Sequence, residues 1–225
     1  MKTTNPFRWT TLTCGIAAAA CLPAFAQNTG FYLKADAGGD ITLNTNLKEF
    51  FGPVAPGTRV KFDPGLRGGI AGGYQVCQWF APEFEIGFLE NQISSITGAD
   101  RVHDAWFANV PFLVNGKFQY PNSSPLTPYA GAGVGFSEAI IDVGRIDING
   151  TSLHGNISDT VFAWQAFAGL RYQINESMGL SVEYRYFAAD GANWRADFTE
   201  NTASDTMRMG RTQTHAVSLA FDFRF

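Results

Sequence analysis

The 225-residue sequence has little charge, few cysteines and no long apolar run after its first segment, and each shortage excludes a class of protein. Charged residues make up 16% of the chain, against about 25% in an average soluble protein. Lysine and arginine form no run and the net charge is −4, so the basic footprint of a nucleic-acid-binding protein is missing. Only Cys77 lies beyond residue 26, which excludes an internal disulfide and a cysteine-based metal site there.

Residues 1–26 have the pattern of a cleaved signal peptide. Basic residues near the start precede a short apolar stretch, and an Ala-Phe-Ala motif follows it. The apolar stretch is too short for a transmembrane helix, which needs about 20 residues. We therefore expect cleavage between Ala26 and Gln27, which leaves a single domain over residues 27–225.

The remainder of the chain alternates apolar and polar side chains with the period of a β-strand. Eight segments show this alternation: 31–37, 66–75, 83–88, 107–120, 129–137, 161–173, 180–186 and 217–225. Several are longer than the roughly 5–6 residues of an average globular strand and match the roughly 9–11 residues of a tilted membrane strand. The pattern predicts a β-protein with membrane-spanning strands.

The connections between these segments alternate in length. Long connections cover residues 40–60, 91–104, 139–159 and 188–212, and short ones lie around Cys77, at 121–127 and at 175–178. Outer-membrane barrels have long loops on the outer side and short turns on the periplasmic side. With an even number of strands, both chain ends fall on the side of the short turns.

The polar face of the predicted strands indicates which side is the interior. In a soluble lipocalin-like barrel, the main alternative, the apolar face would point inward and could bind an apolar ligand. Here the polar face combines glycines with nearly balanced charges, as a narrow interior requires, because an unpaired buried charge is costly. The charged residues are Lys34, Asp36, Arg67, Glu83, Glu85, Lys117, Arg171, Glu183, Arg185, Asp222 and Arg224. We predict that they form a structural ion-pair network inside an all-β, eight-stranded antiparallel transmembrane up-and-down β-barrel.

Four segments carry a resemblance to a known family. They are Pro128–Gly135, Ala168–Tyr172, Glu183–Tyr186 and the terminal Phe221–Phe225. Over nearly its whole length after residue 26, the chain resembles the eight-stranded outer-membrane β-barrels that include OmpX, the Opa proteins and the OmpA barrel. The resemblance implies residence in a bacterial outer membrane. It also implies that Phe221, Phe223 and Phe225 form the assembly signal read by the barrel-assembly machinery.

No residues point to catalysis, and we expect no catalytic, cofactor or metal site. Glu83 and Glu85 share a strand face, but a barrel of eight strands is filled by side chains, so ion pairs explain them. Outer-membrane lipid A deacylases use His and Ser two residues apart, whereas His215 and Ser218 are three apart and fall on opposite faces of a strand. A palmitoyltransferase needs an apolar interior, and this interior is predicted to be charged. A small lipid-modifying enzyme and a narrow channel stay as alternatives.

The remaining functions are a structural role and surface binding or adhesion. Binding would reside in the four long loops, because binding residues are found disproportionately on loops held by a rigid scaffold. Candidate residues are Arg145, Asp147, Asn149 and His154 in the third loop and Trp194, Arg195, Asp197 and Glu200 in the fourth. Their composition identifies no ligand. The expected partners are the outer-membrane lipid bilayer, the assembly machinery and an extracellular ligand of the loops, with the protein a monomer.

Overall fold

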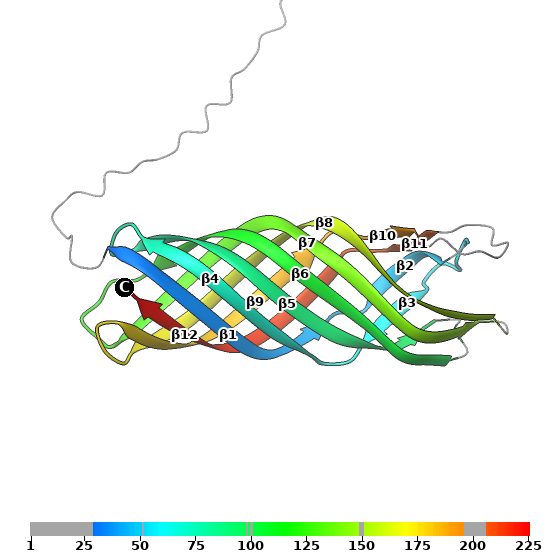
Figure 1. The fold of residues 1–225 in the computed structure, drawn as a ribbon, viewed down its shortest axis with the longest axis horizontal. Coiled ribbons are helices and arrows are strands. Elements are labelled where there is room, and N and C mark those ends of the chain that lie inside the picture. The colour runs from blue at the N-terminus through cyan, green and yellow to red at the C-terminus, as the bar shows by residue number, and fades with distance from the viewer. Residues whose placement is uncertain (1–28, 51, 98, 100, 149–150, 196–205) are drawn as a thin grey trace, which may run out of the picture.

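A computed structural model describes residues 29–225, except 51, 98, 100, 149–150 and 196–205 (Figure 1). All regular elements in this part of the chain are β-strands. No helix among the described residues is long and apolar enough to cross a membrane. The strands form an elongated, twisted barrel, and the start of β1 (Gly30–Thr42) lies at the same end as the C-terminus (Figure 1).

Eight strands close the barrel in antiparallel pairs. With β1 they are β4 (Gly65–Gln75), β5 (Phe80–Ile96), β6 (Arg101–Gln119), β7 (Leu126–Ile148), β8 (Thr151–Gln173), β9 (Met178–Ala189) and β12 (Thr212–Arg224). The order around the ring is β1, β4, β5, β6, β7, β8, β9, β12, and β12 pairs back onto β1. Closure satisfies every strand edge, which a chain in hydrocarbon requires. The predicted fold is confirmed.

The outward face of this ring is apolar over most of its height. Phe31 is 67% exposed, Leu66 72% and Val114 61%, and similar side chains follow on the other strands. A soluble monomer rarely exposes so large an apolar surface, whereas lipid solvates it. The lipocalin-like alternative, with its apolar face inward, is therefore wrong for this part of the barrel.

The end with the short connections, hereafter the turn end, matches the expectation. Short segments join β4 to β5, β6 to β7, and β8 to β9. Tyr74, Tyr120 and Tyr172 lie exposed near these connections, where tyrosines at a membrane interface are favoured.

The opposite end, hereafter the extended end, differs from the expectation of long irregular loops. The connection predicted at 139–159 is mostly a hairpin, because β7 and β8 continue to Ile148 and Thr151. The other long connections contain extra strands or extensions of β5 and β6. The extra strands are β2 (Thr45–Phe50), β3 (Arg59–Phe62), β10 (Asn193–Arg195) and β11 (Thr206–Met209).

These extra strands continue the barrel beyond the ring. Strands β5 to β8 run through without interruption and are 17, 19, 23 and 23 residues long. On the other wall β1 is followed by β2, β4 is preceded by β3, and β12 is preceded by β11. At the extended end, β2 and β3 lie between β11 and β5 (Figure 1). Toward the turn end, β1 and β4 take the corresponding place between β12 and β5.

The inward face of the strands is polar toward the turn end and apolar toward the extended end. On β5, Glu83 and Glu85 point inward and Phe84 and Phe88 outward, but further along Leu89 is buried. The extended end thus has an apolar core. Its buried members include Leu47, Val60, Leu89, Ile93, Phe107, Ile141, Phe187, Trp194, Met207 and Met209. Among the described residues the interior ion pairs lie toward the turn end, so the predicted charged interior does not continue into this core.

Candidate functional site

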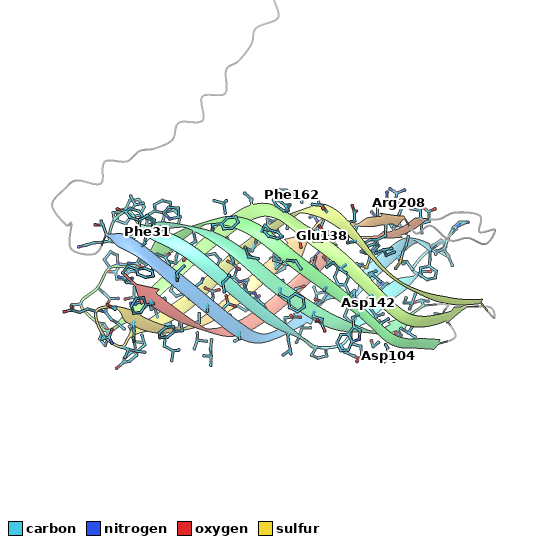
Figure 2. The ribbon with its side chains drawn as sticks, in the orientation of Figure 1. Phe31, Asp104, Glu138, Asp142, Phe162 and Arg208 are labelled. Carbon is cyan, nitrogen blue, oxygen red and sulfur yellow. The ribbon has the colours of Figure 1, made fainter. Side chains whose placement is uncertain are left out.

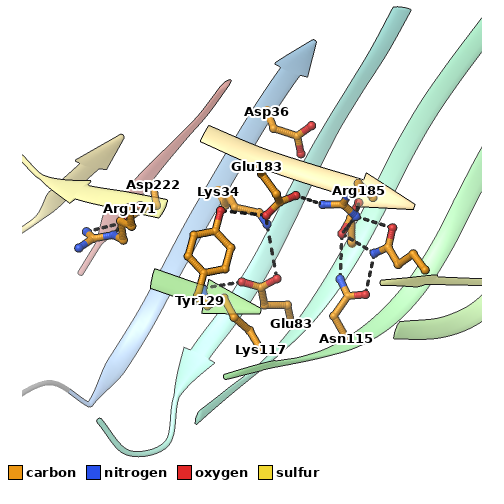
Figure 3. A network of polar contacts seen from close by, with 12 residues as sticks. Lys34, Asp36, Glu83, Asn115, Lys117, Tyr129, Arg171, Glu183, Arg185 and Asp222 are labelled. Atoms are coloured by element: carbon orange, nitrogen blue, oxygen red, sulfur yellow. Dashed lines mark hydrogen bonds and ion pairs between the residues drawn. The ribbon is translucent and has the colours of Figure 1, made fainter. Parts of the chain in front are cut away.

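The inward side chains toward the turn end form one chain of alternating charges, hereafter the interior charge chain. In order of contact it consists of Asp36, Arg67, Glu85, Arg185, Glu183, Lys34, Glu83 and Lys117. Figure 3 shows the part of this series from Arg185 to Lys117. Carboxylates and cations follow each other at every link. Four of each are present in this series, so their formal charges cancel.

Glu85 is the most heavily coordinated member. Arg185 donates from Nη1 to both carboxylate oxygens at 2.6 and 2.8 Å, and Arg67 donates from Nη2 at 2.7 Å. The amides of Asn115 and Gln165 add hydrogen bonds of 2.8 and 2.9 Å. Such charge-assisted contacts satisfy a carboxylate that is 1% exposed.

The other half of the chain centres on Lys34, which lies between two carboxylates. Its Nζ is 3.3 Å from Glu183 Oε2 and 3.6 Å from Glu83 Oε2. Lys117 Nζ is 2.7 Å from the second oxygen of Glu83, which also accepts a 2.5 Å hydrogen bond from the Tyr32 hydroxyl. None of these carboxylates is free to act as a general base, because each already has a cation within contact.

Tyr32 and Tyr129 are interior residues that the sequence analysis did not include in the network. Tyr129 donates its hydroxyl to Glu183 at 3.0 Å. Each tyrosine faces a glycine on the neighbouring strand, Tyr32 opposite Gly73 and Tyr129 opposite Gly169. A Cβ at either glycine would collide with the tyrosine ring, so the missing side chain gives the ring its space. Tyrosine at inward parity was visible in the sequence, but its glycine partner depends on strand register.

Arg171, Asp222 and Arg224 lie apart from the interior charge chain, at the turn end. Arg171 forms a forked pair with Asp222, with Nε and Nη2 donating at 2.8 and 2.7 Å. Within the described residues no ion pair is found for Arg224, which lines a small polar cavity of about 160 Å³ with Arg171 and Gln119. The structure therefore does not bring Arg224 into the predicted network.

A separate polar layer, whose described members include no cation, lies between the interior charge chain and the apolar core. Asn91 donates to Asp40 at 2.6 Å and accepts from the Thr42 hydroxyl at 2.6 Å. Thr42 also contacts Thr214 Oγ1 at 2.7 Å. Asp40 was not predicted as an interior residue, although its even number places it on the face of Lys34 and Asp36.

The predicted loop residues have different outcomes. Trp194 is fully buried in the apolar core and donates from Nε1 to the Ala139 carbonyl at 2.8 Å, so its interpretation as an exposed binding residue is wrong. Arg145, Asp147, His154 and Arg195 lie in strands, but their side chains are outside the described part. Asn149, Asp197 and Glu200 are outside it altogether, as are Ala26 and Gln27.

The pair considered for hydrolase chemistry is separated by the barrel wall. Ser218 is buried on the inward face, while His215 lies on the outer side, where its Nδ1 is 2.7 Å from the Tyr184 hydroxyl. Among the described residues no group of three or more His, Cys, Asp or Glu could hold a metal ion. The arrangement toward the turn end therefore supports packing and charge pairing.

Comparison with known proteins agrees with this architecture. The chain matches the family described as outer membrane protein beta-barrel domain over residues 12–225. It is 27% identical over 143 residues to the outer membrane protein PagN of Salmonella typhimurium, a stretch covering 63% of this chain and 54% of PagN. The chain thus aligns with about half the length of this curated relative.

Two solved structures share the fold. OprG of Pseudomonas aeruginosa superposes with a TM-score of 0.60 at 12% identity, and Neisserial surface protein A with 0.55 at 16%. Each match covers 87% of this chain and 97% of the other. At these identities the likeness concerns the fold alone. On the family match, this chain belongs to the outer membrane protein β-barrel domain family, and it resides in the bacterial outer membrane.

Proposed function

We propose that this protein is a surface-exposed binding or adhesion protein whose extended end projects from the outer face of the outer membrane. The barrel is its anchor, and the interior charge chain stabilises that anchor without performing chemistry. The observation that carries the proposal is the apolar core built into the extended end, beyond the lipid-facing surface.

The outward residues support this division into anchor and projection. On β7 the outward side is apolar at Val134 and Phe136 and becomes acidic at Glu138 and Asp142 (Figure 2). The strand continues ten residues beyond Glu138. At about 3.3 Å per residue this is roughly 30 Å of strand beyond the lipid-facing band. A strand pair of that length, packed at its base on the apolar core, carries Ile148 and Thr151 away from the lipid.

The interior disfavours the channel and enzyme alternatives. Arg185, Glu183 and Glu85 fill the cross-section toward the turn end, and Phe107 and Trp194 fill it toward the extended end. All five side chains are at most 1% exposed, so neither part of the interior offers a wide path for solutes or a substrate cavity. We propose that the protein has no catalytic activity and conducts no solutes.

The route to the membrane follows from the two chain ends. We propose cleavage between Ala26 and Gln27, and recognition of the last strand by the barrel-assembly machinery through Phe221, Phe223 and Phe225. These three rings are exposed on the lipid side of β12 rather than buried in the barrel. We expect a monomer, because β1 and β12 pair with each other and leave no edge of the ring for a second copy.

Adhesion of whole cells tests the binding role. A non-adherent laboratory bacterium expressing the protein should attach to cultured epithelial cells several-fold more than cells with an empty vector. An epitope inserted between β7 and β8 should abolish attachment, and the same epitope at Asn122 should not. Attachment no higher than that of the vector control, with normal surface display, would exclude adhesion to these cells.

A further inference from the structure

A groove lies on the outer surface where the wall with the interrupted strands changes from the ring to the extended end. It has a volume of about 410 Å³ and is lined by Leu43, Asn46, Lys48, Arg59, Arg211 and Gln213, among others. Two strand breaks meet here: β1 ends at Thr42 and β2 begins at Thr45, and β11 ends at Met209 and β12 begins at Thr212.

Hydrogen bonds hold the two breaks together and give the groove a fixed floor. The Leu43 amide donates to the Gln213 carbonyl at 2.8 Å, and the Gly210 amide donates to the Asn46 carbonyl at 2.8 Å. The Thr45 hydroxyl, which is buried, donates to the Arg211 carbonyl at 2.6 Å. With the backbone secured in this way, the long side chains of the lining point outward.

The groove is positively charged. Lys48 and Arg59 are exposed, and within the described part of the chain neither side chain has an ion pair or hydrogen bond. Arg211 directs Nε and Nη2 to one oxygen of Asp190 at 3.1 and 2.9 Å, and its side chain remains 56% exposed. No carboxylate is among the lining residues. Three cations around one groove favour an anionic group, and arginine suits phosphate in particular.

The groove also borders the lipid-facing surface. Ile41 on β1 and Val217 on β12, outward residues on the ring side of the groove, are 57% and 56% exposed. Leu43 belongs to the groove itself and is 42% exposed. An occupant therefore meets cations on one side and hydrocarbon-facing side chains on the other, which is the environment of a lipid headgroup at a membrane interface.

We propose that this groove binds the phosphate-bearing headgroup of a membrane lipid, with the acyl chains along β1 and β12. If the extended end faces outward, as proposed above, the lipid belongs to the outer leaflet. The opposite wall presents the acidic side chains Asp104, Glu138 and Asp142 on its exterior (Figure 2). Phosphate is repelled there, so the lipid binds to one side of the barrel.

Lipid retention in nanodiscs tests the proposal. The purified protein in phosphatidylcholine nanodiscs is incubated with bisphosphorylated lipid A, and retained copies are counted by native mass spectrometry. The wild type should retain at least fivefold more of this lipid than of the same lipid without phosphates. The double variant Lys48→Gln and Arg59→Gln should lose at least fivefold. The matched control, Lys61→Gln and Arg208→Gln, removes the same charges from exposed positions on β3 and β11 outside the groove and should change less than twofold.

Three outcomes would overturn the proposal. The first is equal retention of the lipid with and without phosphates, and the second is an equal loss in the control variant. The third is binding of inorganic pyrophosphate alone as tight as that of lipid A, which would make the occupant a free anion. Because both barrel ends contact lipid in a nanodisc, the result is independent of orientation. A failed surface-display assay would contradict the assignment to the outer leaflet, and a failed adhesion assay would contradict the proposed function. Neither result would contradict lipid binding in the groove.

Discussion

Arg185 on β9 and Glu85 on β5 meet across the full width of the barrel. Their strands are four places apart around the ring in either direction, yet Nη1 and Oε1 are 2.6 Å apart. The two residues are 100 positions apart in the sequence. A buried ion pair thus connects opposite walls, and it is the third of the seven links in the interior charge chain.

Replacing Glu85 with Gln should strongly destabilise the barrel. The change keeps the shape of the side chain but leaves Arg67 and Arg185 short of a counter-charge, at a cost of about 3–5 kcal/mol for a fully buried pair. Urea unfolding of the refolded protein in detergent measures it. The exposed Glu176→Gln, in the turn between β8 and β9, is the control and should change stability by less than about 0.5 kcal/mol. Equal stability of both variants would mean that water screens the interior.

Replacing Gly73 with Ala should also destabilise the barrel, by about 1–3 kcal/mol, because the added methyl group occupies the position of the Tyr32 ring. Gly72→Ala is a closely matched control. It lies one residue away on the outer face, where a Cβ would meet only Leu33 Cδ2 at 3.7 Å. Combining Gly73→Ala with Tyr32→Leu should recover part of the loss. A penalty of similar size at both glycines would point to strand propensity instead of the ring.

Side-chain parity was sufficient to predict the ring and most of the charged residues of its interior. Lys34, Glu83 and Arg185 were assigned to the inside because they alternate with apolar neighbours. Parity could not predict that Glu85 reaches Arg185 and Arg67, because such contacts depend on the stagger between strands around the ring. The same holds for Tyr32 and Gly73, which are brought together by register.

The strands of the extended end were missed for a different reason. Beyond Phe88 on β5 and Phe136 on β7, the inward side becomes apolar and the outward side polar, so the amphipathic pattern reverses without a change of parity. A prediction that requires polar residues inward and apolar residues outward therefore ends the strand at the point of reversal. Trp194 lies in a strand of only three residues, which is too short for an alternation that would reveal its burial.

Trp194→Ala should loosen the extended end and leave the ring folded. Removing a fully buried tryptophan costs about 3–5 kcal/mol, and here it also leaves the Ala139 carbonyl without its donor. Hydrogen exchange should rise in β10, β11 and the outer parts of β7 and β8, while β1 and β12 stay protected. Trp79→Ala, on the exposed surface of the turn end, is the control. Uniform loss of protection over all strands would show that the barrel unfolds as one unit.

Surface labelling should place the extended end outside the cell. Protease added to intact cells should cut within 140–158 or 190–210, and tags at Asn122 or Glu176 should be protected until the outer membrane is opened. The expectation follows from the architecture of outer-membrane barrels, whose short turns lie on the periplasmic side and whose longer loops lie outside the cell. Accessible tags at both turn positions in intact cells would reverse the orientation.

Removing Phe225 should slow assembly far more than it weakens the finished barrel. Its ring is 77% exposed and contacts Phe223 edge-on at a centroid distance of 5.3 Å, so little packing is lost. The Phe225 amide donates to the Phe31 carbonyl at 3.1 Å, a single contact at the end of the β1–β12 seam. If the assembly machinery reads this residue, the deletion should lower the folded protein recovered from cells. Refolding of the purified variant into detergent should stay nearly normal. Phe31→Ala, which removes a comparably exposed ring from the neighbouring strand, should leave assembly in cells unchanged. Equal impairment in cells and in detergent would make Phe225 a packing residue alone.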